Sequence, residues 1–244
     1  MNFSVSGPKV IFTIPVLGGI NITETIVNSW IIIGIITVIC FILTRNLSVK
    51  NPSKKQIIAE QLVGAVQNLV RDTMGEKYMP MFVPYIGALF TLSAISSLSG
   101  LVGARAPTAD LSTTLGWALL AFFMIQGNNI RCHGAGGWLK SFTQPIPVLL
   151  PINIIGEIAN PISMSFRHFG NIASGLVITG LIYGALAALS SAVLHFVPIA
   201  AIQSIPIFQI GLPAFLSLYF DIFTSFLQAY IICMLTMVFV SSAE

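Results

Sequence analysis

The chain has 244 residues, of which 55% are hydrophobic and 8% are charged, and its formal net charge is +3. Soluble domains carry about 25% charged residues, so this composition excludes an ordinary water-soluble enzyme, and the scattered basic residues exclude a nucleic-acid-binding patch. Because a membrane span needs about 20 apolar residues, we predict an all-α polytopic membrane protein. It would form a single membrane domain, residues 1–244, with about five membrane-spanning or strongly tilted helices.

The first residues precede the first predicted span. They lack a basic leader, and Pro15 and the Gly18-Gly19 pair interrupt their apolar stretch. We therefore expect a short peripheral segment on the outer face and no cleaved signal peptide. The first span is predicted over residues 27–44, with Trp30 near one membrane interface.

A polar and basic segment follows the first span. Within residues 54–74 the apolar side chains recur at three- and four-residue spacing: Ile58, Leu62, Val66, Leu69 and Val70. This spacing places them on one face of a helix. It predicts an amphipathic helix that lies along the cytoplasmic surface of the membrane.

Two more spans come next. The second is predicted over residues 81–102, with Pro80 and Pro84 at its start, where a missing N–H group costs least. The third is predicted over residues 111–130. The polar, glycine-rich stretch 131–145 that follows is predicted to be a loop.

The last part of the chain contains two long apolar runs. A proline-broken segment, residues 145–163, is expected to enter the membrane, and a long helix is predicted over residues 161–194. A kinked stretch then contains Pro198, Pro206 and Pro213. The last helix is predicted over residues 214–240.

The basic residues predict the orientation of the spans. Six of the 11 lie in the connection after the first span and two in the loop after the third span, whereas Lys9 and Arg105 lie on the other side. Cytoplasmic loops are enriched in Lys and Arg. The N-terminus is therefore predicted outside and the C-terminus in the cytoplasm.

One basic residue, Arg167, lies inside the predicted long helix. An arginine at bilayer depth costs about 2.5–3.5 kcal/mol, and its guanidinium stays protonated in proteins. The cost is tolerable where the side chain faces a wet cavity or an anionic partner. The alternative is that it snorkels to an interface. We interpret Arg167 as a fixed charge beside a path for a small cation, a proton in our interpretation.

The helical neighbours of Arg167 are small and polar. At three- and four-residue spacing its face carries Ser163, Gly170, Asn171 and Ser174. Such a stripe permits close approach of another helix. Packing between helices of this chain would explain the small residues but not the arginine.

Three further polar residues lie near membrane depth. Asp221 and Gln228 are seven residues apart on the last helix, and Glu157 precedes Arg167 by ten residues, about 15 Å at the helical rise. If Gln228 is level with Arg167, the two carboxylates lie on opposite sides of the arginine. Two aqueous half-paths that do not join would have this layout, with the fixed charge as the barrier. A salt bridge between Asp221 and Arg167 is the alternative.

The sequence has no signature of a phosphate-binding loop, a metal site or a disulfide framework. The glycines at 134–137 are not followed by the GK[ST] of a phosphate loop. His133, His168 and His195 have no metal-ligand spacing, and three scattered cysteines indicate neither a disulfide framework nor a metal site. We predict no catalytic set, no metal and no cofactor in this chain.

The segment SFRHFGN, with PTADLSTTLGWALL before it and LQAYI after it, resembles subunit a of the F-type ATP synthase. The resemblance covers nearly the whole chain in span order. It implies a non-catalytic stator against a rotating ring of c subunits, with peripheral-stalk b subunits and the rest of the complex as partners, in a bacterial-type plasma membrane. It implies roles in ion translocation for Arg167, Asn171, Gln228, Asp221 and Asp110.

Two positions depart from the family pattern. His168 stands where many members have leucine, and it adds a titratable group. Leu176 stands where many carry Glu or His, so the outer path would rely more on Asp221. Alternatives are a sodium-translocating version of the same subunit, a purely structural anchor, and a self-contained secondary transporter, for which inverted repeats would be expected and none is found.

Overall fold

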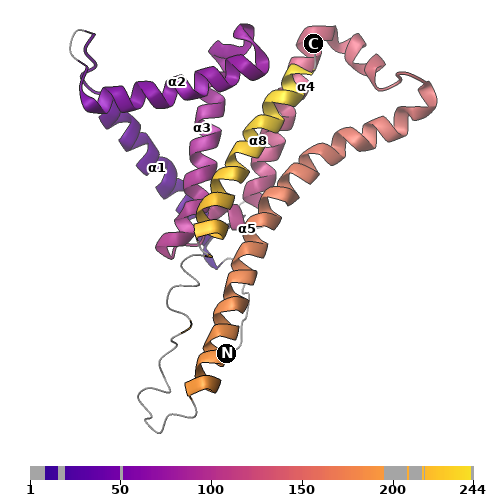
Figure 1. Ribbon diagram of the computed structural model, residues 1–244. Coiled ribbons are helices and arrows are strands. Elements are labelled where there is room, and N and C mark those ends of the chain that lie inside the picture. Colours follow the sequence, from indigo (N-terminus) through magenta and orange to yellow (C-terminus); the bar gives the residue numbers. More distant parts are fainter. Residues whose placement is uncertain are drawn as a thin grey trace.

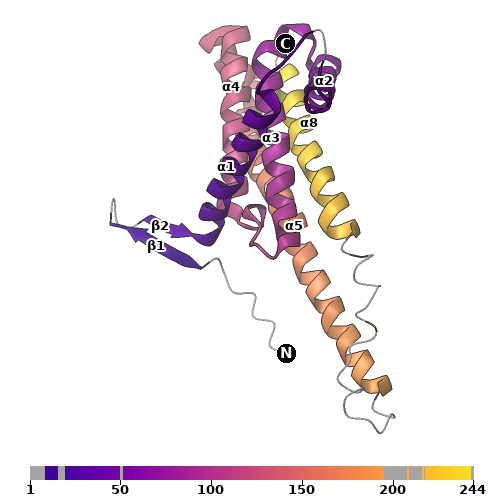
Figure 2. The ribbon, with the colours of Figure 1, turned by 90° about the vertical axis from the view of Figure 1, so that its left-hand side faces the viewer.

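The computed structural model describes residues 9–15, 20–49, 52–194, 208, 216 and 218–242. These residues form a helical bundle with one small β-hairpin (Figures 1 and 2). The all-α polytopic class is therefore confirmed. The main elements are β1 Val10–Ile14, β2 Ile20–Thr23, α1 Glu24–Thr44, α2 Lys54–Met74, α3 Met79–Leu98, α4 Leu111–Ser141, α5 Leu150–Leu194 and α8 Thr224–Ser241.

Short helical turns complete the described chain. Four are 3₁₀ turns and one is π-helical: Glu76–Tyr78, Ser99–Val102, Pro107–Ala109, Pro147–Leu149 and the π turn Leu218–Phe223. The predicted kinked stretch with Pro198, Pro206 and Pro213, and the predicted start of the last helix at Ala214, lie outside the described residues.

The expected peripheral segment contains an antiparallel hairpin. In its register Phe12 pairs with Ile22 and Thr13 with Asn21, and the Thr13 hydroxyl donates to the Asn21 side-chain oxygen at 3.0 Å. Because side chains alternate along a strand, the first pair lies on one face and the second on the other. The hairpin projects sideways from the start of α1 (Figure 2). We call this end of the bundle the hairpin end.

The predicted amphipathic helix 54–74 is confirmed as α2, and it lies across the opposite end of the bundle (Figure 1). The Ser53 hydroxyl accepts from the Gln56 N–H at 3.3 Å, as an N-cap does. Gly75, with a φ of 85°, follows its last residue. We call this end of the bundle the α2 end.

The apolar stripe of α2 is divided between two surroundings. Val70 and Met74 are buried against the bundle, whereas Ile58 and Leu62 are 53% and 61% exposed. The exposed half is free to contact lipid. That it lies along the membrane remains a prediction.

Four helical segments among the described residues are long and apolar enough to cross a membrane, judged by length and composition: Glu24–Thr44, Glu76–Val102, Pro147–Val193 and Leu218–Ser241. The segment 111–130, predicted as a third of five spans, is not among them. It belongs to α4, whose sequence carries Gln126, Asn128 and Asn129 toward the α2 end. Its membrane crossing remains a prediction.

The predicted loop over residues 131–145 is wrong for most of its length. Helical structure continues to Ser141, interrupted by a kink at Gly134 with φ 70° and ψ 164°. Glycine costs only about 1 kcal/mol in a helix interior. Contacts made by the helical segment after Gly134 can therefore offset the cost of its glycines. Only the residues after Ser141 form the connection to α5.

The predicted start of the long helix at Pro161 is also wrong. α5 begins at Leu150 and contains Pro161 in its interior. Proline is tolerated inside membrane helices because neighbouring helices satisfy the backbone groups that it leaves without a partner. The helix has 45 residues, so it is about 68 Å long, and it changes direction along its course (Figure 1).

The core lies between α3, α4, α8 and the end of α2. Its members are Val70, Met74, Tyr78, Phe82, Ile86, Leu89, Ala118, Ala121, Ile125, Met164, Ile232, Cys233, Met237 and Val240. The small residues Ala118 and Ala121 allow α4 to approach its neighbours closely. This core holds the middle of α5 against α4 and α8.

Gly134→Ala should destabilise the protein, because φ and ψ at this position fall in a region that only glycine adopts readily, at a cost of about 1–3 kcal/mol for other residues. Gly136→Ala is the matched control, since Gly136 lies two residues on with no positive φ and open space around its Cα. Thermal unfolding of the purified chain in detergent should show a lower midpoint for the first variant alone. Equal midpoints would contradict the assigned kink.

Candidate functional site

Arg167 lies on α5 with its side chain exposed in the isolated chain. It makes no hydrogen bond or ion pair with any described residue, so the predicted alternative of a salt bridge with Asp221 finds no support. Ser163, Asn171 and Ser174, which share its face, are exposed as well. The stripe around Arg167 is thus not covered by the described helices of this chain.

Apolar side chains surround the stripe. Phe166 on α5 is 54% exposed, and Phe226 and Leu227 on α8 are exposed too. A cation on an apolar, membrane-embedded surface is expensive unless an anion or water meets it. The surface therefore has the chemistry of an interface for a partner that brings a negative charge.

Asn171 and Gln228 meet next to this arginine. The Asn171 side-chain amide donates to the side-chain oxygen of Gln228 at 2.8 Å, and Gln228 is only 2% exposed. Asn171 lies one helical turn beyond Arg167, so this bond places Gln228 close to the level of the arginine. This contact between α5 and α8 was not predicted from the sequence, which left the level of Gln228 as a condition.

Asp221 lies on the hairpin side of that contact. It is partly buried and belongs to the π-helical turn Leu218–Phe223, where its backbone carbonyl accepts from the Ser225 hydroxyl. Seven residues separate it from Gln228, about 10 Å along the axis. Short π-helical turns are frequent at functional sites, and the apolar sequence had predicted a regular helix here.

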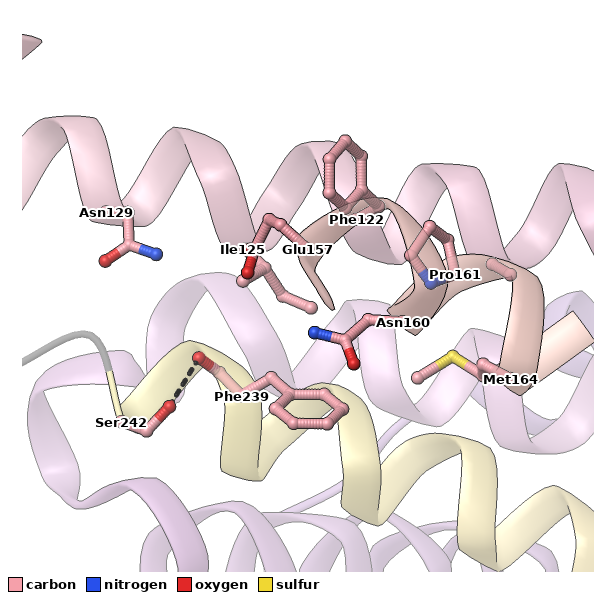
Figure 3. Close-up of a pocket in the computed structure, with 10 residues that line it drawn as sticks. Phe122, Ile125, Asn129, Glu157, Asn160, Pro161, Met164, Phe239 and Ser242 are labelled. Carbon is pink, nitrogen blue, oxygen red and sulfur yellow. Dashed lines mark hydrogen bonds between the residues drawn. The ribbon is translucent and has the colours of Figure 1, made fainter. Parts of the chain in front are cut away.

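Glu157 lies on the other side, toward the α2 end, where two pockets meet. The smaller, of about 110 Å³, lies between α4, α5 and α8, and Glu157, Asn129 and Asn160 line it (Figure 3). The larger, of about 540 Å³, shares these three residues. Both volumes are sufficient for water. The smaller pocket reaches Met164, which lies one helical turn before His168.

His168 points into the bundle and not onto the stripe. It is fully buried, with its Nε2 3.5 Å from the Ser93 hydroxyl and its ring edge-on to Trp117 at 5.8 Å between centroids. Its polar and ring contacts with described residues are to Ser93 and Trp117, and neither Asp221 nor Glu157 is among them. Its place next to Arg167 in sequence therefore does not make it part of the exposed site.

Asp110 lies at the hairpin end and caps α4. Its carboxylate accepts from the Ser112 N–H at 3.1 Å, the Ser112 hydroxyl at 2.6 Å and the Thr25 hydroxyl at 2.8 Å. Partial burial raises the pKa of Asp110, but the bonds from Ser112 and Thr25 and the charge of Arg105 outweigh it and hold the pKa below its ordinary value. The contacts join α1 to α4 at this end.

A family model described as ATP synthase A chain matches residues 26–241. The chain belongs to the ATP synthase A chain family. This membership confirms the resemblance and supports an ion-translocating role in an ATP synthase complex, in place of a self-contained transporter. The apolar helices and the family together make the chain an integral membrane protein.

Several proteins named as subunit a of an ATP synthase are similar to this chain over most of their length. "ATP synthase subunit a 2" of Bradyrhizobium sp. is 33% identical over 228 residues, 93% of this chain and 91% of the relative. "ATP synthase subunit a, sodium ion specific" of Propionigenium modestum is 29% identical over 271 residues, 98% of this chain and 86% of the relative. "ATP synthase subunit a" of Desulforamulus reducens is 29% identical over 227 residues.

Sequence reasoning missed two groups of polar residues in this family member. One is a set of buried hydroxyls between α3, α4 and α5: Ser93, Ser96, Ser97, Thr108, Thr114 and Ser165. The helical spacing of the three serines was a signal that could have been used. The other is the pair Gln126 and Trp138, which contacts Glu157 through Gln126. No sequence signal could have revealed this pair, because it depends on the kink at Gly134.

Asp110→Ala should lower the stability of the chain by about 1 kcal/mol, the usual cost of losing an N-cap. The pKa of Asp110 is depressed in the folded chain, so its carboxylate stabilises at neutral pH and loses this effect as the pH falls below about 4. The gap in thermal midpoint between wild type and variant, measured in detergent by circular dichroism, should therefore narrow at pH 3.

The control is Asp72→Ala, which removes an exposed carboxylate from the last turn of α2. It should change stability by less than about 0.5 kcal/mol. A gap for Asp110→Ala that stays the same from pH 7 to pH 3 would show that the carboxylate's charge plays no part.

Proposed function

We propose that this chain is the proton-translocating stator subunit of an F-type ATP synthase, with two offset half-paths separated by Arg167. The observation that carries the proposal is the exposed guanidinium, which has no counter-ion among the described residues and stands on an uncovered stripe of small residues. Such a charge needs an anionic partner from another chain. We infer that the chain itself is not catalytic and couples ion flow to the synthesis or hydrolysis of ATP elsewhere in the complex.

The partner that fits the stripe is a ring of c subunits that carries buried carboxyl groups. Small residues let a partner helix approach Arg167 closely. At 4 Å and an effective dielectric constant of about 20, an arginine–carboxylate pair is worth around 4 kcal/mol before desolvation. This attraction favours the ionised carboxylate beside Arg167, yet it is weak enough to be broken at each step of rotation.

The two half-paths follow from the positions of the acidic residues. A cation enters at the hairpin end near Asp221 and Asn171 and neutralises a ring carboxylate. The neutral site can then face lipid, where the charged form would be too costly. On return it ionises beside the pockets at Glu157 and releases its cation toward the α2 end. Arg167 lies between the two approaches and repels a cation that would cross directly.

The distribution of basic residues supports an orientation. The connection that contains α2 carries six of them, so the α2 end faces the cytoplasm under the positive-inside rule. We infer an outside N-terminus and a cytoplasmic C-terminus in a bacterial-type plasma membrane, with five spans that include α4. Peripheral-stalk b subunits are the expected further partners.

Arg167→Ala should lower ion-driven ATP synthesis by at least about a hundredfold, because the carboxylate loses a pairing worth several kcal/mol. The complex should still assemble, since the Arg167 side chain has no contact to lose within the described chain. ATP synthesis and the amount of assembled complex would be measured in membrane vesicles. Arg71→Ala, an exposed arginine on α2, is the control. Normal coupled synthesis by Arg167→Ala would refute the proposal.

A sodium-translocating version of the same subunit is the second candidate, because a relative that is 29% identical over 98% of this chain is named as sodium ion specific. The identity of the ion can be read from protection of the complex against a carboxylate-modifying reagent. If protons are carried, adding sodium should leave the rate of inactivation unchanged at fixed pH. Protection by millimolar sodium would favour the sodium version and leave the role of Arg167 in place.

A further inference from the structure

Three side chains form a hydrogen-bonded series at the α2 end. The indole N–H of Trp138 donates to the side-chain oxygen of Gln126 at 2.8 Å. The side-chain amide of Gln126 in turn donates to the carboxylate of Glu157. Gln126 is 8% exposed, and it lines the larger pocket together with Trp138 and Glu157.

The hydrogen bond from Trp138 determines which atom of the Gln126 amide faces Glu157. An indole N–H is a donor only, whereas the amide of glutamine has an accepting oxygen and a donating nitrogen. Facing Trp138, the amide of Gln126 must present its oxygen. Its nitrogen then points to Glu157, which is held as an acceptor. Without the indole the amide of Gln126 is free to turn, and Glu157 loses a donor held in a fixed position.

The series exists because of the kink at Gly134. In a straight helix twelve residues span about 18 Å, so Trp138 could not reach Gln126. The φ of 70° at Gly134 turns the second segment of α4 back toward the first. The ring of Trp138 is also packed edge-on against Phe142, with 5.1 Å between centroids.

We propose that Trp138, acting through Gln126, is a positioning residue that holds the Glu157 carboxylate as an acceptor where the two pockets meet. This inference rests on the proposed function, in which a cation leaves along these pockets. Of the described residues that line either pocket, Glu157 alone carries an ionisable side chain. The orientation of Glu157 therefore determines where a departing cation meets a negative charge.

The test is Trp138→Phe, which keeps an aromatic ring and removes the N–H donor. The complete ATP synthase would be reconstituted in liposomes, and the initial rate of ATP-driven ion pumping would be measured against ATP hydrolysis in the same sample. We expect pumping to fall about tenfold, the effect of losing about one hydrogen bond. Trp30→Phe is the matched control, because Trp30 lies exposed on α1, and it should pump at the wild-type rate.

The specificity of the effect is tested in a Glu157→Ala background. There Trp138→Phe should cause no further loss, because the side chain that it orients is gone. An additional tenfold loss in that background would mean that Trp138 acts through the fold, and it would overturn the inference. The same holds if Trp138→Phe pumps normally while Glu157→Ala is slow. Normal pumping by Glu157→Ala alone would instead refute the half-path at Glu157, and with it this inference.

Discussion

The constraint on which this structure depends is a permanent positive charge on a surface that faces a low-dielectric layer. Arg167 has no counter-ion in the described chain, and its guanidinium cannot be neutralised by losing a proton. Such a charge is tolerable only while water or an anion meets it. In the function proposed above, the exposed stripe and the separated acidic residues serve that requirement. The proposed partner would supply that anion.

Polar contacts between helices hold this arrangement in place. The Thr114 and Ser165 hydroxyls meet at 3.2 Å between α4 and α5, and Asn171 meets Gln228 between α5 and α8. Hydrophobic burial gives helices little reason to associate within a bilayer, because lipid is as apolar as their side chains. Directional bonds and small residues therefore determine which turns face each other. They set the level of Gln228 relative to Arg167.

Local sequence patterns predicted most helices but misjudged two regions. The glycines and polar residues of the stretch 131–145 are typical of a loop, yet helical structure persists to Ser141. Pro161 is typical of a helix boundary, yet α5 continues through it. In both cases the local cost is a few kcal/mol or less, and contacts with other helices outweigh it. Local propensity contains no information about those contacts.

The sequence by itself determined the class of the protein, the amphipathic nature of α2 and the unusual residue Arg167, because composition, helical periodicity and a charge in an apolar run are local properties. It also predicted Glu157 and Asp221 on opposite sides of the arginine, on the condition that Gln228 is level with it, since rise per residue converts spacing into height. The tertiary structure alone decided which side chains meet. The contact of Asn171 with Gln228, the burial of His168 away from the stripe and the hydrogen bonds from Trp138 to Glu157 join residues on different helices or across a kink. Such contacts depend on how helices cross and bend, and one-dimensional spacing does not contain that geometry.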